Sequence, residues 1–217
     1  MDVGDEGSVA SAVKDVLTHC SELDALVCNA GIGIFGSVEE TSIADAKAQL
    51  DTNFFGVLRT LRAVIPHMRT RARGRIVLVG SLAGREPIPF QAHYSASKAA
   101  VASVALALRS ELHGSGVQVS LIEPGDINTP FNDATDFGSS RNSAYADRIR
   151  SCQRVIEEAL PQAPGPEVVA AAIHKALSAR RARVRYTVGP DSWLVPLGQR
   201  FLPDALMLRL VRGHFRI

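Results

Sequence analysis

The sequence predicts an α/β protein with a parallel sheet and helices on both faces, and two observations support that fold class. Apolar runs of strand length alternate along the chain with longer segments of helical periodicity. The strand-length runs are almost continuously apolar, which is typical of parallel strands buried on both faces. With 217 residues, 46% of them hydrophobic and 21% charged, the chain is long enough for a sizeable core, so we expect one domain over residues 1–217.

The first half of the chain is expected to supply one strand and one long helix. The segment LDALVCNAG, residues 23–31, is a short apolar run that ends in Asn-Ala-Gly and is typical of a buried strand. A helix is predicted over 42–68, with Thr41 or Ser42 as its N-cap. Its apolar stripe consists of Leu50, Phe54, Val57, Leu61 and Ile65.

The second half continues the alternation of strands and helices. A strand is predicted over 75–81, RIVLVGS, and the next helix runs from Tyr94 to the glycines that follow His113. The remaining expected elements are strands over 117–125 and 184–190 and helices near 143–160 and 166–180. Strands joined by helices in this way form a parallel sheet.

Composition excludes several classes of protein. The three cysteines, Cys20, Cys28 and Cys152, form no CxxC pair and no metal-ligand spacing with histidine, so we expect a reduced, cytoplasmic protein without a metal site. The opening residues MDVGDEGSVA lack the apolar run of a secretory leader. No apolar stretch approaches the roughly 18 residues that a membrane-spanning helix needs.

The C-terminal part of the chain is basic and amphipathic. From Arg180 onward, eight arginines and two aspartates give +6, against +2 for the whole chain, so the remainder carries −4. No aromatic pattern interleaved with the arginines supports nucleic-acid binding. Within the tail 191–217, we expect 201–217 to form a helix docked on its own domain, with a membrane-surface or partner-binding role as the alternative. The apolar side of that helix is expected to contain Leu202, Leu206, Met207, Leu210 and Val211.

The opening of the third helical segment carries a pair of residues that suits catalysis. Tyr94 and Lys98 are one helical turn apart, which places a phenol and an ammonium on one face. A phenol has a pKa of about 10, and a nearby ammonium lowers it, so Tyr94 could serve as a general acid/base. A Tyr/Lys pair on a solvated helix face is the alternative.

Two further side chains are candidates for the same site. Ser81 ends an apolar strand, and in a parallel sheet the carboxyl ends of the strands carry the functional groups, although a turn-capping serine fits the same position. Asn53 lies on the apolar stripe of its helix. A buried amide without a partner costs about 1–3 kcal/mol, so a functional group or a neighbouring carbonyl must hydrogen-bond it.

Two motif matches are not interpreted as functional motifs. Residues 31–36 fit G-x-G-x-x-G, but no helix starts at the third glycine as a phosphate site requires, so this is a glycine loop beside a cofactor. Ser95 and Lys98 fit the S-x-x-K of penicillin-recognising serine hydrolases. The accompanying S-D-N and K-T-G elements are absent, which leaves a serine hydrolase as the third alternative for function.

Taken together, these residues resemble the short-chain dehydrogenase/reductase family. NAG at 29–31, Asn53, Ser81, the Y-x-x-x-K of 94–98 and PGDINT at 124–129 follow one another in the family's order. The resemblance implies a Rossmann-type sheet and NAD(H)- or NADP(H)-dependent interconversion of a secondary alcohol and a ketone.

The resemblance also implies a role for each candidate catalytic residue. Tyr94 would be the general acid/base and would also contact the cofactor, and Lys98 would lower the pKa of Tyr94 and hold the nicotinamide ribose. Ser81 would orient the substrate carbonyl. Asn53 would complete a proton relay through water to Lys98.

The cofactor contacts are implied in the same way. Asn29, Ala30 and Gly31 would line the adenosine side, and Asp2 and Val3 would contact adenine. The residues expected to flank the nicotinamide are Pro124, Gly125, Ile127 and Thr129. The sequence does not distinguish NAD from NADP. The resemblance also implies a homodimer or homotetramer.

The chain departs from the family's pattern at its start, where the first strands and a TGxxxGxG turn would precede Asp2. We therefore expect a sheet that lacks its first strands, weak or no cofactor binding by this 217-residue form, and a non-catalytic remnant as the alternative function. An apolar alcohol or ketone is the expected substrate. The residues that suggest an apolar pocket are Ile88, Pro89, Phe90, Phe131 and Phe137.

Overall fold

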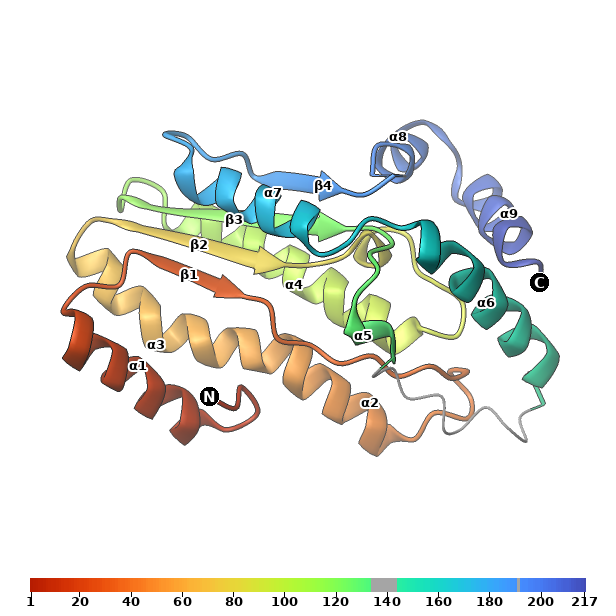
Figure 1. Ribbon diagram of the computed structural model, residues 1–217, viewed down its shortest axis with the longest axis horizontal. Helices are drawn as coiled ribbons and strands as arrows, with labels where there is room; N and C mark the ends of the chain where they lie inside the picture. Colours follow the sequence, from red (N-terminus) through yellow and green to blue (C-terminus); the bar gives the residue numbers. More distant parts are fainter. Residues whose placement is uncertain (134–143, 191) are drawn as a thin grey trace.

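Helices and strands alternate around one sheet in the computed structural model, which describes residues 1–133, 144–190 and 192–217 (Figure 1). The strands are β1 (Ala25–Cys28), β2 (Gly74–Val79), β3 (Val117–Pro124) and β4 (Arg185–Val188). The α-helices are α1 (Glu6–Cys20), α2 (Ile43–Leu50), α3 (Gly56–Thr70), α4 (Ala92–Glu111), α5 (Pro130–Asp133), α6 (Ala146–Ala159), α7 (Glu167–Ser178), α8 (Leu194–Phe201) and α9 (Asp204–Phe215). Shorter helical turns are η1 (Asp51–Phe55), η2 (Leu82–Gly84) and η4 (Leu160–Gln162).

The sheet has the order β1-β2-β3-β4, and every neighbouring pair of strands is parallel. Val27 lies opposite Val77 in the β1–β2 pair, and Leu121 lies opposite Arg185 in the β3–β4 pair. The predicted α/β class, with its parallel Rossmann-type sheet, is therefore confirmed. Among the described residues, β1 forms an edge of the sheet, and its residue Val27 is 38% exposed.

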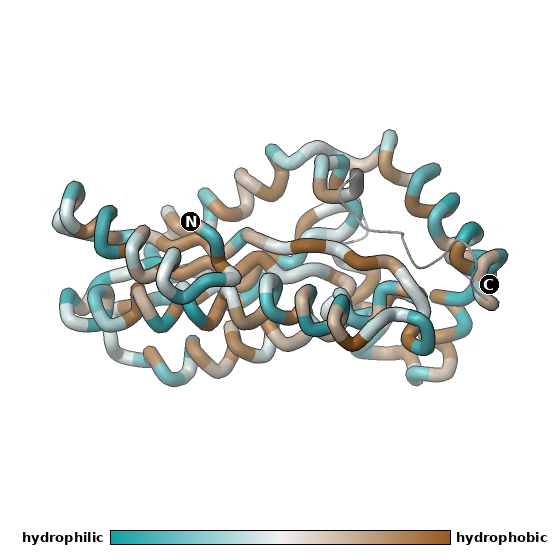
Figure 2. The backbone as a smooth tube through the Cα atoms, turned by 90° about the horizontal axis from the view of Figure 1, so that it is seen from below, coloured by the Kyte–Doolittle hydropathy of each residue, from teal (hydrophilic) through white to brown (hydrophobic). Residues whose placement is uncertain are grey.

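The two faces of the sheet are covered by different helices (Figure 1). Leu78 and Leu121 pack on the face covered by α3 and α4, together with Leu61 of α3. Val77 and Ile122 pack on the opposite face against α7. Because successive strand residues point to opposite faces, burial of both faces explains the continuous apolar runs in the sequence. Along the helices, hydrophobic stretches alternate with hydrophilic ones, as expected for helices with one buried side (Figure 2).

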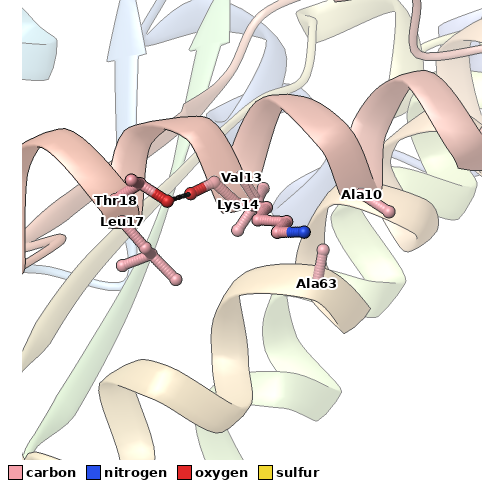
Figure 3. A pocket seen from close by; sticks show the side chains of 6 residues that line it. All are labelled: Ala10, Val13, Lys14, Leu17, Thr18 and Ala63. Atoms are coloured by element: carbon pink, nitrogen blue, oxygen red, sulfur yellow. Dashed lines mark hydrogen bonds between the residues drawn. The ribbon is translucent and has the colours of Figure 1, made fainter.

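The helix α1 lies outside the elements predicted from sequence. The Asp5 carboxylate caps it by accepting a hydrogen bond from the Gly7 amide at 2.9 Å, and Val9 is buried. A hollow of about 460 Å³ lies between α1 and α3 (Figure 3). Its lining residues are Ala10, Val13, Lys14, Leu17, Thr18 and Ala63, none of which is a candidate site residue.

The predicted 42–68 helix is observed as α2, η1 and α3 in uninterrupted succession. Ser42 is its N-cap, and its hydroxyl accepts a hydrogen bond from the Asp45 amide at 3.0 Å. The middle turn, η1, is a π-helix that contains Asn53. A π-turn adds a residue to one helical turn, and such turns are frequent at functional sites.

The C-terminal helix docks on its own domain, but only part of the predicted apolar side, including Met207 and Val211, takes part. Met207 and Phe215 are buried, and Phe215 and Val211 pack in a cluster with residues of α6. Leu206 and Leu210, which were expected on the apolar side, are 41% and 53% exposed. The reason is geometric. The docked residues Met207, Val211 and Phe215 are four positions apart and form one stripe. Leu206 and Leu210 each precede a residue of that stripe and so lie about 100° around the helix from it.

No helix among the described residues is long and apolar enough to cross a membrane.

Candidate active site

A cavity of about 910 Å³ lies at the carboxyl ends of the strands. Because the strands are parallel, the residues that follow β1, β2 and β3 meet at the same edge of the sheet. The sequence-predicted site residues that line this cavity are Asn29, Ala30, Gly31, Ser81, Tyr94, Lys98, Pro124, Gly125, Ile127 and Thr129. The fold therefore brings together most of a set that is scattered over about a hundred positions of the sequence.

Ser81, Tyr94 and Lys98 converge on one part of the cavity. Tyr94 and Lys98 occupy successive turns of α4, and the Lys98 Nζ lies 5.7 Å from the centre of the Tyr94 ring. Ser81 directly follows β2 and caps η2, with its Oγ accepting a hydrogen bond from the Ala83 amide at 3.1 Å. A side-chain hydrogen bond also links Ser81 to Tyr94. The serine is thus both a turn cap and a partner of the phenol.

Burial dominates the protonation of the Tyr94 phenol. It raises the pKa of Tyr94 above the usual value of 10, and the hydrogen bond from Ser81 only partly opposes that increase. Lys98 is not among the causes of this shift, so its expected lowering of the pKa of Tyr94 stays a prediction. The Lys98 ammonium is instead directed at the Val79 carbonyl, with an Nζ–O distance of 3.1 Å.

Lys98 carries a buried ammonium group that uses only one of its N–H donors in the described part of the chain. The residue is 5% exposed, and burial lowers the pKa of Lys98 to about 8. An ammonium has three N–H donors, and the Val79 carbonyl is its one hydrogen-bond acceptor within the described part of the chain. Its remaining donors suit a ligand with hydroxyl acceptors, such as the ribose of a nicotinamide cofactor, so this residue fits the cofactor that the sequence implies.

The side chain of Asn53 is buried behind the cavity and does not line it. Its Oδ1 accepts a hydrogen bond from the Ile32 amide at 2.8 Å, while its Nδ2 donates to the Ile32 carbonyl and to the Ser97 hydroxyl, each at 3.0 Å. These bonds hold the loop after β1 against α4. The side chain makes no hydrogen bond to Lys98, so the relay through water stays a prediction.

Gly31 lies where this loop passes closest to the buried polar groups. A Cβ atom at Gly31 would lie 3.2 Å from the Asn53 Oδ1 and 3.6 Å from the Lys98 Nζ. The absence of a side chain therefore lets the backbone run alongside both groups. After it, the chain continues as a loop until α2 begins at Ile43, so the glycines of 31–36 do not lead into a helix N-terminus. This agrees with the interpretation that they form no phosphate cradle.

Asp2 and Val3 are not brought into the cavity. The Val3 side chain packs against Gly56, and its carbonyl accepts a hydrogen bond from the Arg59 guanidinium at 3.1 Å. The Asp2 carboxylate accepts one from the Gly4 amide at 2.8 Å. Their contact with adenine stays a prediction.

Ser95 does not have the surroundings of a nucleophile. The residue is 3% exposed and does not line the cavity, and its Oγ accepts a hydrogen bond from the Ile88 amide at 3.2 Å. Its role in the structure is to hold the loop after η2 on the first turn of α4. This observation speaks against the serine-hydrolase alternative.

A buried ion-pair network holds the same loop from the other side. The Glu123 carboxylate, 1% exposed at the end of β3, binds the Arg85 guanidinium through two hydrogen bonds of 2.9 and 2.8 Å. Arg185 of β4 pairs with the same carboxylate. Because Arg85 directly follows η2, Glu123 ties the segment that carries Ser81 to the two neighbouring strands.

Much of the cavity wall was missed by sequence reasoning. The lining residues from α6, η4, α7 and α9 are Val155, Ile156, Ala159, Leu160, Val169, Ala170, Ile173, His174, Leu177, His214 and Phe215. These helices are amphipathic, and periodicity alone cannot distinguish an apolar side chain that faces a cavity from one that packs in the core. No signal in the sequence separates the two.

The residues expected to form an apolar pocket divide into three groups. Ile88 and Phe131 line the cavity, with the rings of Phe131 and Tyr94 centred 5.8 Å apart. Phe90 stacks instead on Phe35 outside it, at a ring distance of 6.3 Å. Pro89 does not line the cavity, and Phe137 lies outside the described residues.

The fold and the site define a class of protein, the oxidoreductases that bind a dinucleotide at the carboxyl ends of a parallel sheet. A model of the family described as "short chain dehydrogenase" matches residues 1–137. The chain belongs to the short-chain dehydrogenase family. It is accordingly an NAD(P)-dependent dehydrogenase/reductase, and the family predicted from sequence is confirmed.

Individual proteins show how far the similarity extends. The chain is 35% identical over 220 residues to a 3-ketodihydrosphingosine reductase from Bacteroides thetaiotaomicron. The matched region covers 100% of this chain and 82% of that protein. It is 36% identical over 191 residues to estradiol 17-beta-dehydrogenase 1 from Rattus norvegicus, covering 86% of this chain and 55% of that protein.

Solved structures agree. A short-chain dehydrogenase from Streptomyces avermitilis has a TM-score of 0.81 and 30% identity, covering 98% of this chain and 76% of that one. A short-chain dehydrogenase from Burkholderia cenocepacia in complex with NADP has a TM-score of 0.73 and 26% identity, and the match covers 97% of this chain and 76% of that one.

Proposed function

We propose that the protein interconverts an apolar secondary alcohol and the corresponding ketone, with Tyr94 as general acid/base. One observation carries this proposal. Ser81, Tyr94 and Lys98 meet in a cavity whose other walls, from Phe131 and the helices α6, α7 and α9, are mostly apolar. Three polar side chains clustered at one point of an otherwise apolar cavity suit a substrate with one reactive oxygen on a hydrocarbon framework.

The nicotinamide cofactor, when bound, supplies or accepts the hydride at the carbinol carbon. In the direction of reduction, the Tyr94 hydroxyl donates its proton to the carbonyl oxygen as that oxygen becomes negative. The Ser81 hydroxyl donates a hydrogen bond to the same oxygen and stabilises the developing charge. In the direction of oxidation, the Tyr94 oxygen takes the proton back from the alcohol.

Lys98 has two proposed tasks. Its free N–H donors bind the ribose hydroxyls of the cofactor, and its positive charge favours the phenolate of Tyr94 once a ligand has closed the cavity to water. Asn29, Ala30 and Gly31 line the part of the cavity that holds the adenosine half of the cofactor. The proposed nicotinamide contacts are Pro124, Gly125, Ile127 and Thr129, and the role of Asn53 is to position the loop that carries Gly31.

The apolar character of the substrate is supported from two directions. The helices α6 and α7 contribute Val155, Ile156 and Leu177 to the cavity, with Phe215 from α9 beside them. Two of the relatives are a 3-ketodihydrosphingosine reductase and an estradiol dehydrogenase, names that refer to lipophilic molecules. NADP and NAD remain equal candidates for the cofactor.

The substrate class can be tested with a series of methyl ketones of increasing chain length, assayed with NADPH and with NADH. We expect kcat/KM for reduction to rise by up to about fourfold for each added methylene, because each buried methylene contributes about 0.8 kcal/mol. A ketone of the same length with hydroxyls along its chain is the matched control and should be a poor substrate. Preference for the hydroxylated ketone would contradict an apolar pocket.

The pH dependence provides a separate test of Lys98. Since burial lowers the pKa of Lys98 to about 8, the ammonium is present below that pH and is lost above it. Tyr94, whose pKa is raised above 10, stays protonated over this window. We therefore expect cofactor affinity, measured by quenching of protein fluorescence, to fall as the pH rises from about 7 to about 9. An affinity that is constant over this range would show that the ammonium does not hold the cofactor.

A further inference from the structure

The helix α8 turns an apolar stripe toward solvent. Leu194, Leu197 and Phe201 are 46%, 48% and 69% exposed, and Trp193, immediately before the helix, is 61% exposed. Their spacing places the three helical residues on one side of α8. These four residues are called the α8 stripe below. Its orientation is the reverse of the usual one, in which the apolar side of a surface helix faces the core.

Contacts of two other residues of the helix, Gly198 and Gln199, hold α8 in this orientation. Gly198 packs so closely on α9 that a Cβ atom there would lie 2.9 Å from the Met207 sulfur. Gln199 donates hydrogen bonds to the Arg85 carbonyl and, at 3.4 Å, to the Glu86 carboxylate. Rotation of α8 to bury the stripe would break these contacts, so its exposure is built into the fold.

The helices α8 and α9 also carry positive charge. Arg200 of α8 and Arg209 and Arg212 of α9 are exposed, and none of them forms an ion pair with a carboxylate of residues 1–133, 144–190 or 192–217. Arg216 is different, because it pairs with Glu158 at 3.0 Å. The helix pair therefore offers exposed apolar side chains together with guanidinium groups that have no carboxylate partner in the described part of the chain.

We propose that α8 and α9 form a docking surface for an anionic lipid bilayer. Leucine, phenylalanine and tryptophan side chains enter the boundary between headgroups and acyl chains, and tryptophan favours that boundary. The three arginines, Arg200, Arg209 and Arg212, meet the negatively charged lipid phosphates. A second copy of the chain fits less well, because a two-fold contact uses the same patch of both copies and would bring two sets of positively charged arginines into one interface.

The same helix pair adjoins the cavity. His214 and Phe215 of α9 line it, and Gln199 of α8 contacts the loop that leads to the lining residue Ile88. Docking would place the cavity beside the bilayer, which is where an apolar substrate dissolves. That link to the substrate rests on the proposed function, whereas lipid binding itself does not depend on turnover.

Co-sedimentation of the 217-residue chain with vesicles tests the proposal. We expect at least tenfold tighter binding to vesicles of phosphatidylcholine with phosphatidylglycerol than to phosphatidylcholine alone. The triple variant Leu194→Ser/Leu197→Ser/Phe201→Ser should bind the anionic vesicles at least tenfold more weakly. The triple variant Arg200→Gln/Arg209→Gln/Arg212→Gln should lose the preference for anionic over neutral vesicles.

Matched variants elsewhere on the surface provide the controls. Val38 and Ile43 are 67% and 69% exposed, so Val38→Ser/Ile43→Ser removes comparable apolar surface from another region. Arg62→Gln/Arg69→Gln/Arg181→Gln removes the same charge from exposed positions. Both variants should bind vesicles like the unchanged protein, with circular dichroism confirming the fold of every variant.

Several results would overturn the proposal. They are failure of the unchanged protein to bind anionic vesicles, equal losses in the control variants, and a stripe-dependent dimer in size-exclusion chromatography that does not bind lipid. The last result would mean that a second copy covers the stripe. Activity on soluble ketones is measured separately, so failure of lipid docking and failure of the proposed function remain distinguishable.

Discussion

Replacement of Tyr94 by phenylalanine is expected to lower turnover about 10²–10⁴-fold, the range that a positioned general acid/base contributes. The substitution removes only the hydroxyl, so the ring stays packed beside Phe131 and the cavity keeps its shape. Cofactor affinity should be nearly unchanged, because the proposed ribose contact belongs to Lys98. Steady-state kinetics and cofactor titration on the same preparation separate the two effects.

Tyr145→Phe is the matched control for this experiment. The Tyr145 hydroxyl donates a hydrogen bond to the Glu39 carboxylate at 2.6 Å, and the residue does not line the cavity. Its removal should leave kcat within about twofold of the unchanged protein, since surface substitutions away from a site have small effects. If Tyr94→Phe retained comparable activity, the assignment of the acid/base would be wrong.

Glu123→Ala is expected to have the largest effect on stability. It removes a carboxylate that is 1% exposed and leaves the guanidinium groups of Arg85 and Arg185 without their partner. Loss of one member of a buried ion pair costs about 3–5 kcal/mol in the free energy of unfolding. Because the two arginines are 22% and 29% exposed, water screens them in part, and we expect about 3 kcal/mol, measured by urea denaturation.

Glu158→Ala makes the same chemical change at the surface. Glu158 pairs with Arg216 at 3.0 Å, and the two side chains are 51% and 59% exposed. An exposed ion pair contributes about 0–1 kcal/mol, so this variant should unfold at almost the same urea concentration as the unchanged protein. Equal losses in the two variants would mean that the Glu123 network contributes no more than a surface pair.

The sheet and the core of the site could be predicted from sequence because both depend on local patterns. The strands β1, β2 and β3 lie in short, mostly apolar runs, and the residues that follow or end these runs, such as Gly31, Ser81 and Pro124, are recognisable without a structure. Parallel topology then requires these ends to lie at one edge. The Y-x-x-x-K spacing placed Tyr94 and Lys98 on one helix face, and the fold turned that face toward Ser81.

The remaining features depend on contacts between distant segments. The π-turn around Asn53 has no marker in the sequence, since its hydrogen bonds go to Ile32 and Ser97, 21 and 44 positions away. The raised pKa of Tyr94 follows from burial, which only the assembled cavity determines. The side of α9 that docks depends on α6, so hydrophobic spacing alone placed Leu206 and Leu210 on the wrong side.

The start of α4 binds each surrounding segment separately. Tyr94 is linked to Ser81, Ser95 holds the Ile88 amide, and Lys98 holds the end of β2. Because Tyr94 and Lys98 belong to the same helix, their separation is set by α4 itself and does not depend on the conformation of the loops around the cavity. Changes in the length or sequence of those loops would therefore alter which molecules enter the cavity more than the alignment of the proposed acid/base pair.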